Sequence, residues 1–163
     1  RKGFTLIEML IVVSIIGLLA SIVLVGLRGT REKARDARRI ADLKEVQVGL
    51  ELYFEKCRFY PSGPWPGPRP CTRIRISQNV NTDESWRDLT NALVGTDLGI
   101  NAVPNDPIHP VRTYAYRPDE RENLRYVMRT QFEDLNSQAL NADIDGAPLG
   151  VDCVDPFYCV GLF

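Results

Sequence analysis

One apolar stretch near the N-terminus constrains this chain more than any other feature. Phe4 to Leu27 spans twenty-four residues and holds a single charge, Glu8. A helix needs about 20 residues to cross ~30 Å of hydrocarbon, so this segment is long enough to span a bilayer. A carboxylate at the bilayer centre costs roughly 2.5–3.5 kcal/mol on insertion scales. Because no partner for Glu8 stands out within the apolar run, the sequence predicts that its partner belongs to another chain.

The helical pattern continues beyond the apolar stretch. Residues 28–57 are rich in Ala, Glu, Lys, Arg and Leu, which favour helix. A helix over residues 4–55 would be about 78 Å long at ~1.5 Å per residue, and Pro61 is expected to end it. One apolar stripe, interrupted at Gln47, should pack on a globular domain; its members are Ala37, Ile40, Leu43, Leu50, and Tyr53 or Phe54.

Residues 58–163 predict one small head domain. The segment 61–70 has five prolines and two glycines and is expected to be a loop. Trp65 in this loop is a candidate for surface contact, and the alternative is that it packs under the loop. A short helix is predicted over Ser85 to Val94, with Ser85 as its cap and with an apolar face of Trp86, Leu89 and Leu93.

The second half of the head has strand character. Thr113 to Tyr116 and Leu124 to Phe132 are aromatic and partly alternating, and residues 118–123 suit a hairpin loop between them. The tail, 141–163, is expected to be a loop with Asp-Gly and Asp-Pro turns. The predicted fold class is α+β, with a long N-terminal helix packed on an antiparallel sheet of three or four strands.

Four cysteines lie beyond the apolar segment: Cys57, Cys71, Cys153 and Cys159. An even number in an exported domain indicates two disulfides; four reduced, buried thiols in a cytosolic domain are the alternative. Three pairings are possible, and loop-closure entropy favours the two short ones, Cys57–Cys71 and Cys153–Cys159. A zinc site is not expected, because His109 is the only histidine and neither pair has Cys-x-x-Cys spacing.

Charge is distributed unevenly along the chain. Residues 28–44 carry seven bases and three acids, although the whole chain has a net charge of −1. This basic stretch could be a nucleic-acid patch, but its interleaved acids favour a solvated face or a contact with acidic surfaces of neighbouring copies. The positive-inside rule alone would place the head in the cytoplasm, whereas the cysteines favour export.

No catalytic set is present in the sequence. A second histidine, a Gly-x-Ser-x-Gly motif and a phosphate-binding loop are all missing. We therefore expect a protein that is not an enzyme.

The N-terminal residues carry a specific resemblance. Arg1-Lys2-Gly3-Phe4-Thr5-Leu6-Ile7-Glu8 resembles the processing site of type IV pilins and type II secretion pseudopilins. The resemblance implies cleavage after Gly3 by a prepilin peptidase, N-methylation of Phe4, and a role for Glu8 in assembly. Residues 1–3 would be a leader remnant, 4–27 a transmembrane and filament-core helix, 28–57 its amphipathic continuation, and 58–163 a pilin head.

The resemblance also implies a function, partners and a location. The leading interpretation is a type IV pilus subunit for adhesion, motility or DNA uptake. The alternatives are a major pseudopilin of type II secretion and a monomeric membrane-anchored binding protein. A filament subunit would associate with itself, an inner-membrane assembly platform and an assembly ATPase complex. It would move from the cytoplasmic membrane to an extracellular filament on the cell surface.

The tail resembles the acidic loop that binds calcium in major pseudopilins. Its carboxylates are Asp143, Asp145, Asp152 and Asp155, and hard oxygen ligands on a flexible loop suit Ca²⁺. The sequence predicts no cofactor, and the resemblance adds calcium as the one candidate. The alternative is that these residues serve only as turn residues.

Overall fold

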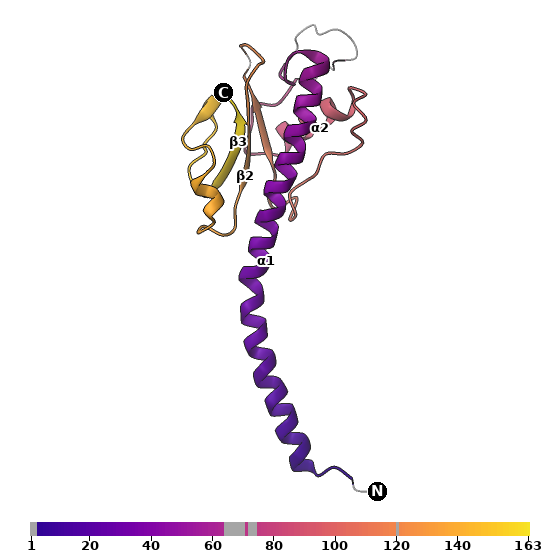
Figure 1. Cartoon of the computed structure of the whole chain (residues 1–163), viewed down its shortest axis with the longest axis vertical. Helices are drawn as coiled ribbons and strands as arrows, with labels where there is room; N and C mark the ends of the chain where they lie inside the picture. Colours follow the sequence, from indigo (N-terminus) through magenta and orange to yellow (C-terminus); the bar gives the residue numbers. More distant parts are fainter. Residues whose placement is uncertain (1–2, 64–70, 72–74, 120) are drawn as a thin grey trace.

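A long helix packed on a small antiparallel sheet forms the molecule (Figure 1). The computed structural model describes residues 3–63, 71, 75–119 and 121–163, with residues 22–28 described by their backbone only. The helix α1 (Leu6–Cys57) packs its C-terminal half on the head, while its N-terminal half extends away from it (Figure 1). The predicted α+β arrangement is confirmed.

Local interactions explain where α1 begins and ends. Thr5 is its N-cap and forms a capping box with Glu8, which satisfies two of the backbone donors left open at a helix start. At the other end Arg58 adopts the left-handed conformation (φ 64°) and donates its N–H to Phe54 O at 2.7 Å. The helix therefore ends at Cys57, and the prediction that Pro61 ends it was wrong.

The core lies between α1 and the sheet. Leu43, Leu50 and Tyr53 are fully buried, as the apolar stripe predicts, and Val46 joins them. Ala37 was predicted to belong to this stripe but is exposed. Ile40, also predicted for the stripe, is partly buried and packs against this core, whereas charged residues occupy the neighbouring buried positions of the helix: Asp36, Arg39 and Asp42.

The sheet contains three strands in the order β1-β2-β3: β1 (Ala115–Pro118), β2 (Tyr126–Gln131) and β3 (Phe157–Leu162). The first two match the predicted hairpin. The third was missed, because its turn residues and glycine favoured a loop. Gly161 is required there, since a Cβ would lie 2.2 Å from Tyr126 O on the neighbouring strand.

The short helix α2 (Glu84–Val94) lies beside β1 and carries the predicted buried face of Trp86, Leu89 and Leu93. Ser85 was predicted to be the N-cap of this helix, but Asp83 occupies that position. Ser85 lies within the helix, fully buried, and its hydroxyl oxygen accepts the Tyr116 N–H at 3.3 Å.

The head contains two disulfides, Cys57–Cys71 and Cys153–Cys159. The sequence separations are 14 and 6, so the structure has the pairing that loop entropy favours. The first joins the end of α1 to the segment after the proline-rich loop. Most of that loop, including Trp65, lies outside the described residues.

Candidate functional sites at the two ends of the chain

The predicted processing bond lies in an open position. Gly3 and Phe4 precede the first turn of α1 and are both exposed, with Phe4 80% accessible. Arg1 and Lys2 lie outside the described residues. The Gly3–Phe4 bond therefore lies outside the helix, and its backbone is exposed to a peptidase.

Glu8 has partners within its own chain. The Thr5 N–H donates to Glu8 Oε2 at 2.8 Å, the Thr5 hydroxyl also bonds Oε2, and the Glu8 N–H donates to Thr5 Oγ1 at 3.3 Å. The expectation that the apolar run offers Glu8 no partner was wrong, because the capping box of α1 uses this carboxylate. Both bonds that the described residues donate to the carboxylate use Oε2, and among these residues Oε1 has no donor.

The first part of α1 exposes its apolar side chains. Large apolar residues from Phe4 to Leu19 are half or more accessible, and they include Leu6, Ile7, Val13 and Leu18. Over the part of the chain that the structure describes, no helix is long and apolar enough to cross a membrane. The span over 4–27 stays a prediction.

Two arginines of the basic stretch of α1 form ion pairs inside the molecule, which the sequence did not predict. Arg39 is fully buried and donates to Asp36 Oδ1, to both Asp106 oxygens and to Glu133 Oε1. Arg35 makes a paired contact with the same Glu133. These two arginines fasten α1 to the loop before β1 and to the segment after β2, so they are not available to a neighbouring copy.

The two arginines and three carboxylates of this cluster are linked to one another by hydrogen bonds. The Arg35 and Arg39 guanidinium groups lower the pKa of Glu133 to about 2, against the opposing effect of burial. Burial would lower the pKa of Arg39, but hydrogen bonds to Asp106, Glu133 and Asp36 raise it above its ordinary value. Asp36 also accepts the backbone N–H groups of Glu133 and Asp134 at 2.8–3.1 Å. The cluster therefore has a structural role, since it joins α1 to two segments of the head.

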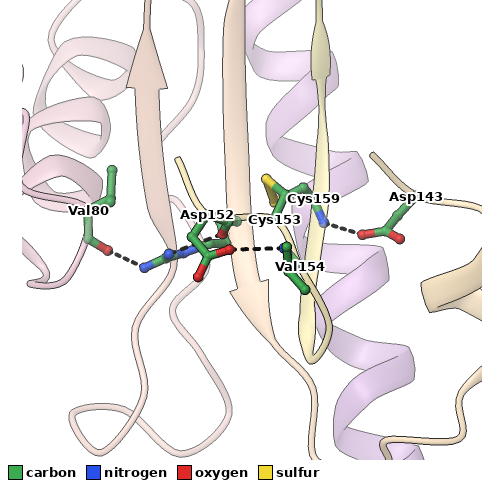
Figure 2. The surroundings of a disulfide bond; sticks show 7 residues. Val80, Asp143, Asp152, Cys153, Val154 and Cys159 are labelled. Atoms are coloured by element: carbon green, nitrogen blue, oxygen red, sulfur yellow. Dashed lines mark hydrogen bonds between the residues drawn. A yellow bond between two sulfur atoms is a disulfide. The ribbon is translucent and has the colours of Figure 1, made fainter. Parts of the chain in front are cut away.

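Three of the four predicted carboxylates meet in the C-terminal loop. Asp143, Asp145 and Asp155 each offer an oxygen, and these oxygens lie within 4.8 Å of one another. Asp152 does not join them, contrary to the prediction. Its side chain accepts the Val154 N–H at 3.2 Å, and in Figure 2 it lies across the Cys153–Cys159 disulfide from Asp143.

Asp143 is the innermost member of this group. Its Oδ2 accepts the Cys159 N–H of β3 at 2.7 Å (Figure 2), whereas its Oδ1 is buried and bonds nothing in the described part of the chain. Burial, together with the charges of Asp145 and Asp155, raises its pKa. A buried carboxylate oxygen with two acidic neighbours fits a hard divalent cation such as Ca²⁺, which takes carboxylate and carbonyl oxygens.

Comparison with known proteins decides what the N-terminal segment is. Residues 1–24 match the family described as "Prokaryotic N-terminal methylation motif". The chain has a prepilin-type N-terminus. The motif places Gly3, Phe4 and Glu8 within one recognised segment and confirms the resemblance drawn from the sequence.

Curated relatives extend the prepilin-type similarity. The chain is similar to the Type II secretion system core protein G of Escherichia coli K12 and of Pectobacterium carotovorum, with 37% identity over 62 residues in each case. The corresponding protein of Vibrio cholerae is 38% identical over 62 residues. Each match covers 38% of this chain and about two fifths of the relative, 43%, 40% and 42% respectively. No solved structure matches the chain.

Proposed function

We propose that this chain is a structural, non-catalytic subunit of a type II secretion pseudopilus, a helical filament held together by its N-terminal helices. The observation that carries the proposal is the prepilin-type motif combined with the similarity to core protein G. Those relatives favour the secretion pseudopilin, which was the alternative interpretation, over the type IV pilus for adhesion, motility or DNA uptake.

The exposed apolar half of α1 supports polymerisation. Burying apolar surface contributes roughly 25 cal/mol per Å², so side chains such as Leu6 and Ile7, 83% and 68% exposed, favour a bundle with other copies. Before assembly the same surface would sit in the cytoplasmic membrane. An inner-membrane assembly platform and its ATPase would transfer each subunit from that membrane to the filament.

Processing would supply a partner for Glu8 on another copy of the chain. Hydrolysis after Gly3 by a prepilin peptidase would free the Phe4 amine, which is then methylated and remains able to carry a proton. In the low dielectric of a helix bundle, that amine and the Glu8 carboxylate of a neighbouring copy attract strongly. The pair would fix how far adjacent copies are displaced along the filament.

We also propose that Asp143, Asp145 and Asp155 hold a calcium ion. The support is the buried, unbonded Oδ1 of Asp143 and the proximity of the other two carboxylates. The positive ion would offset the mutual repulsion of three acidic side chains at close range. It would thereby hold the C-terminal loop against β3, at the backbone that Asp143 already contacts.

Deletion and complementation in the native host test the filament proposal. Deleting the gene should abolish protein export without loss of surface pili, and the wild-type chain should restore export. Glu8→Ala should fail to restore it, whereas Glu122→Ala, a change in the exposed hairpin loop, should succeed. Mass spectrometry of purified filaments should show a methylated Phe4 at the N-terminus.

Two outcomes would contradict the proposal. Loss of surface pili with intact export would indicate a type IV pilus subunit. A membrane monomer that never polymerises, and for which Glu8→Ala is harmless, would indicate an anchored binding protein.

A further inference from the structure

Two arginines of the head line a cavity on the face of the sheet that points away from α1. Tyr126 and Met128 of β2 pack in the core with α1, whereas Val127 belongs to a separate cluster. Successive side chains of a strand alternate between its two faces, so Arg129 shares the outer face with Val127. The cavity has a volume of about 230 Å³, and Arg112 and Arg129 both contribute to its lining.

Arg112 is held in place by backbone carbonyls. The pairing of β1 with β2 extends only to Ala115 and Arg129. Beyond that point Arg112 Nη1 donates to Gln131 O at 2.8 Å and to Phe132 O at 3.0 Å, where a strand partner would otherwise lie. These two bonds orient the half-buried guanidinium group. Its Nε and Nη2 donors form no hydrogen bond with a described residue.

The open edge of Arg112 is the one that other arginines of this chain use to bind carboxylates. Arg35 reaches both Glu133 oxygens through Nε and Nη2, and Arg39 reaches both Asp106 oxygens in the same way. Two parallel N–H groups match the geometry of a carboxylate or a phosphate. Because Arg112 has no such acid within the described chain, its edge is available to an anion from outside.

Arg129 adds a buried positive charge to the same cavity. It is 8% exposed, and its donors bind Val80 O at 2.9 Å, Asp152 O at 3.2 Å and the Asn81 side-chain oxygen at 3.1 Å. All three acceptors are neutral. Burial lowers the pKa of Arg129, although the charge of the Asp152 side chain acts in the opposite direction. A buried charge without a counterion is costly, so an anion in the cavity would stabilise the folded chain.

The described lining of this cavity contains no acidic side chain. The cavity beside Arg117, another arginine that donates to a backbone carbonyl, includes Asp119 in its lining. The cavity of Arg112 and Arg129 therefore has two positive charges and no negative one. Its volume is below the roughly 300–1,000 Å³ typical of sites for drug-sized ligands, which suits a small anion.

We propose that this cavity binds a tetrahedral oxyanion, a phosphate or sulfate group, between Arg112 and Arg129. The open edge of Arg112 would hold two of its oxygens, and Arg129 would neutralise the charge on the others. A carboxylate has only two oxygens, which Arg112 alone would bind, so it would leave Arg129 without a counterion. The chemistry is the same for a free ion and for a phosphate ester. The site shares no residue with the carboxylate cluster or with the N-terminal segment, so it stands independently of the calcium and filament proposals.

Titration of the full-length chain in detergent tests the site, with a chelator present to exclude calcium. Phosphate, sulfate and glycerol phosphate at millimolar concentration should shift the NMR signals of the Arg112 and Arg129 Nε–H groups. They should also raise Tm, because a ligand that binds only the folded chain stabilises it. Acetate is the carboxylate probe and should bind more weakly than phosphate.

Variants of Arg112 separate the paired donors from the charge. Arg112→Gln should weaken phosphate binding at least about tenfold, through loss of a charge-assisted two-bond contact. Arg112→Lys keeps the charge but not the paired donors and should recover only part of that loss. If Arg112→Gln does not fold, Arg112→Lys provides the comparison. Arg117→Gln is the matched control, since it also removes a half-buried arginine that binds a carbonyl, and it should leave phosphate binding unchanged.

The probes also distinguish the two sources of the oxyanion. Tighter binding of glycerol phosphate than of phosphate would assign the site to a phosphate ester, and equal or weaker binding would assign it to the free ion. The proposal is overturned if no probe shifts the two Nε–H signals, if acetate binds as tightly as phosphate, or if Arg117→Gln weakens binding as much as Arg112→Gln. None of these results would affect the filament or calcium proposals, which depend on export and on calcium-dependent stability.

Discussion

Arg39 and Asp106 form a fully buried, two-pronged ion pair, with Nε 2.7 Å from Oδ2 and Nη2 3.0 Å from Oδ1. The two residues are 67 positions apart. The pair fixes the middle of α1 to the loop before β1, at the level where the helix leaves the head. Together with the contacts of Arg35 and Asp36 to the segment after β2, it attaches α1 to the globular part.

Breaking this pair should destabilise the protein strongly. Arg39→Met leaves Asp106 and Asp36 buried without their cation, and removing one partner of a buried pair costs about 3–5 kcal/mol. Chemical denaturation of the full-length chain in detergent measures this free energy. Arg58→Met, which disrupts an exposed pair with Glu55, should cost less than about 1 kcal/mol. Equal effects of the two changes would show that the buried pair has no special role.

Acid should weaken the fold through Glu133. Its folded-state pKa of about 2 lies below its ordinary value of 4.5, so the folded state binds its proton less readily than the unfolded chain does. The resulting stabilisation is complete above the unfolded pKa and is lost as pH falls through the interval from about 5 to 2. Glu133→Gln should flatten the pH dependence of the unfolding free energy over that interval. Parallel pH curves for variant and wild type would refute this assignment.

Loss of either disulfide should lower stability, and by different amounts. The chain-entropy relation gives about 3 kcal/mol for the loop closed by Cys57–Cys71 and about 2 kcal/mol for the shorter one closed by Cys153–Cys159. Paired Cys→Ala variants, unfolded with denaturant in detergent, test the order. A larger cost at Cys153–Cys159 would mean that the C-terminal loop contributes native contacts beyond chain entropy.

Calcium should stabilise the chain through the three clustered carboxylates. At a concentration one hundred times its dissociation constant, a ligand adds about 2.7 kcal/mol, which calorimetry detects as a rise in Tm. Asp143→Asn and Asp155→Asn should abolish that rise, and Asp152→Asn should preserve it, since Asp152 bonds a backbone N–H instead. No heat of binding and no shift in Tm at millimolar calcium would end the calcium proposal.

The N-terminal half of the protein is determined largely by its sequence. Helix periodicity, the apolar run and the Gly3-Phe4 step act locally, within a few residues of one another, so they can be recognised without a tertiary structure. The disulfide pairing also follows locally, because the short loops have the lowest closure entropy. The fold class, the β1–β2 hairpin and the buried face of α2 were predictable because each depends on residues that are close together in the sequence.

Only the tertiary structure decided which charges are internal and which carboxylates meet. Arg39 and Arg31 belong to the same basic stretch, yet one is buried against Asp106 and the other is exposed. Asp152 and Asp155 are three residues apart, but only Asp155 points toward Asp143 and Asp145. β3 was missed because its pairing with β2 joins segments some thirty residues apart. Such long-range contacts depend on how the whole chain packs, and no local pattern encodes them.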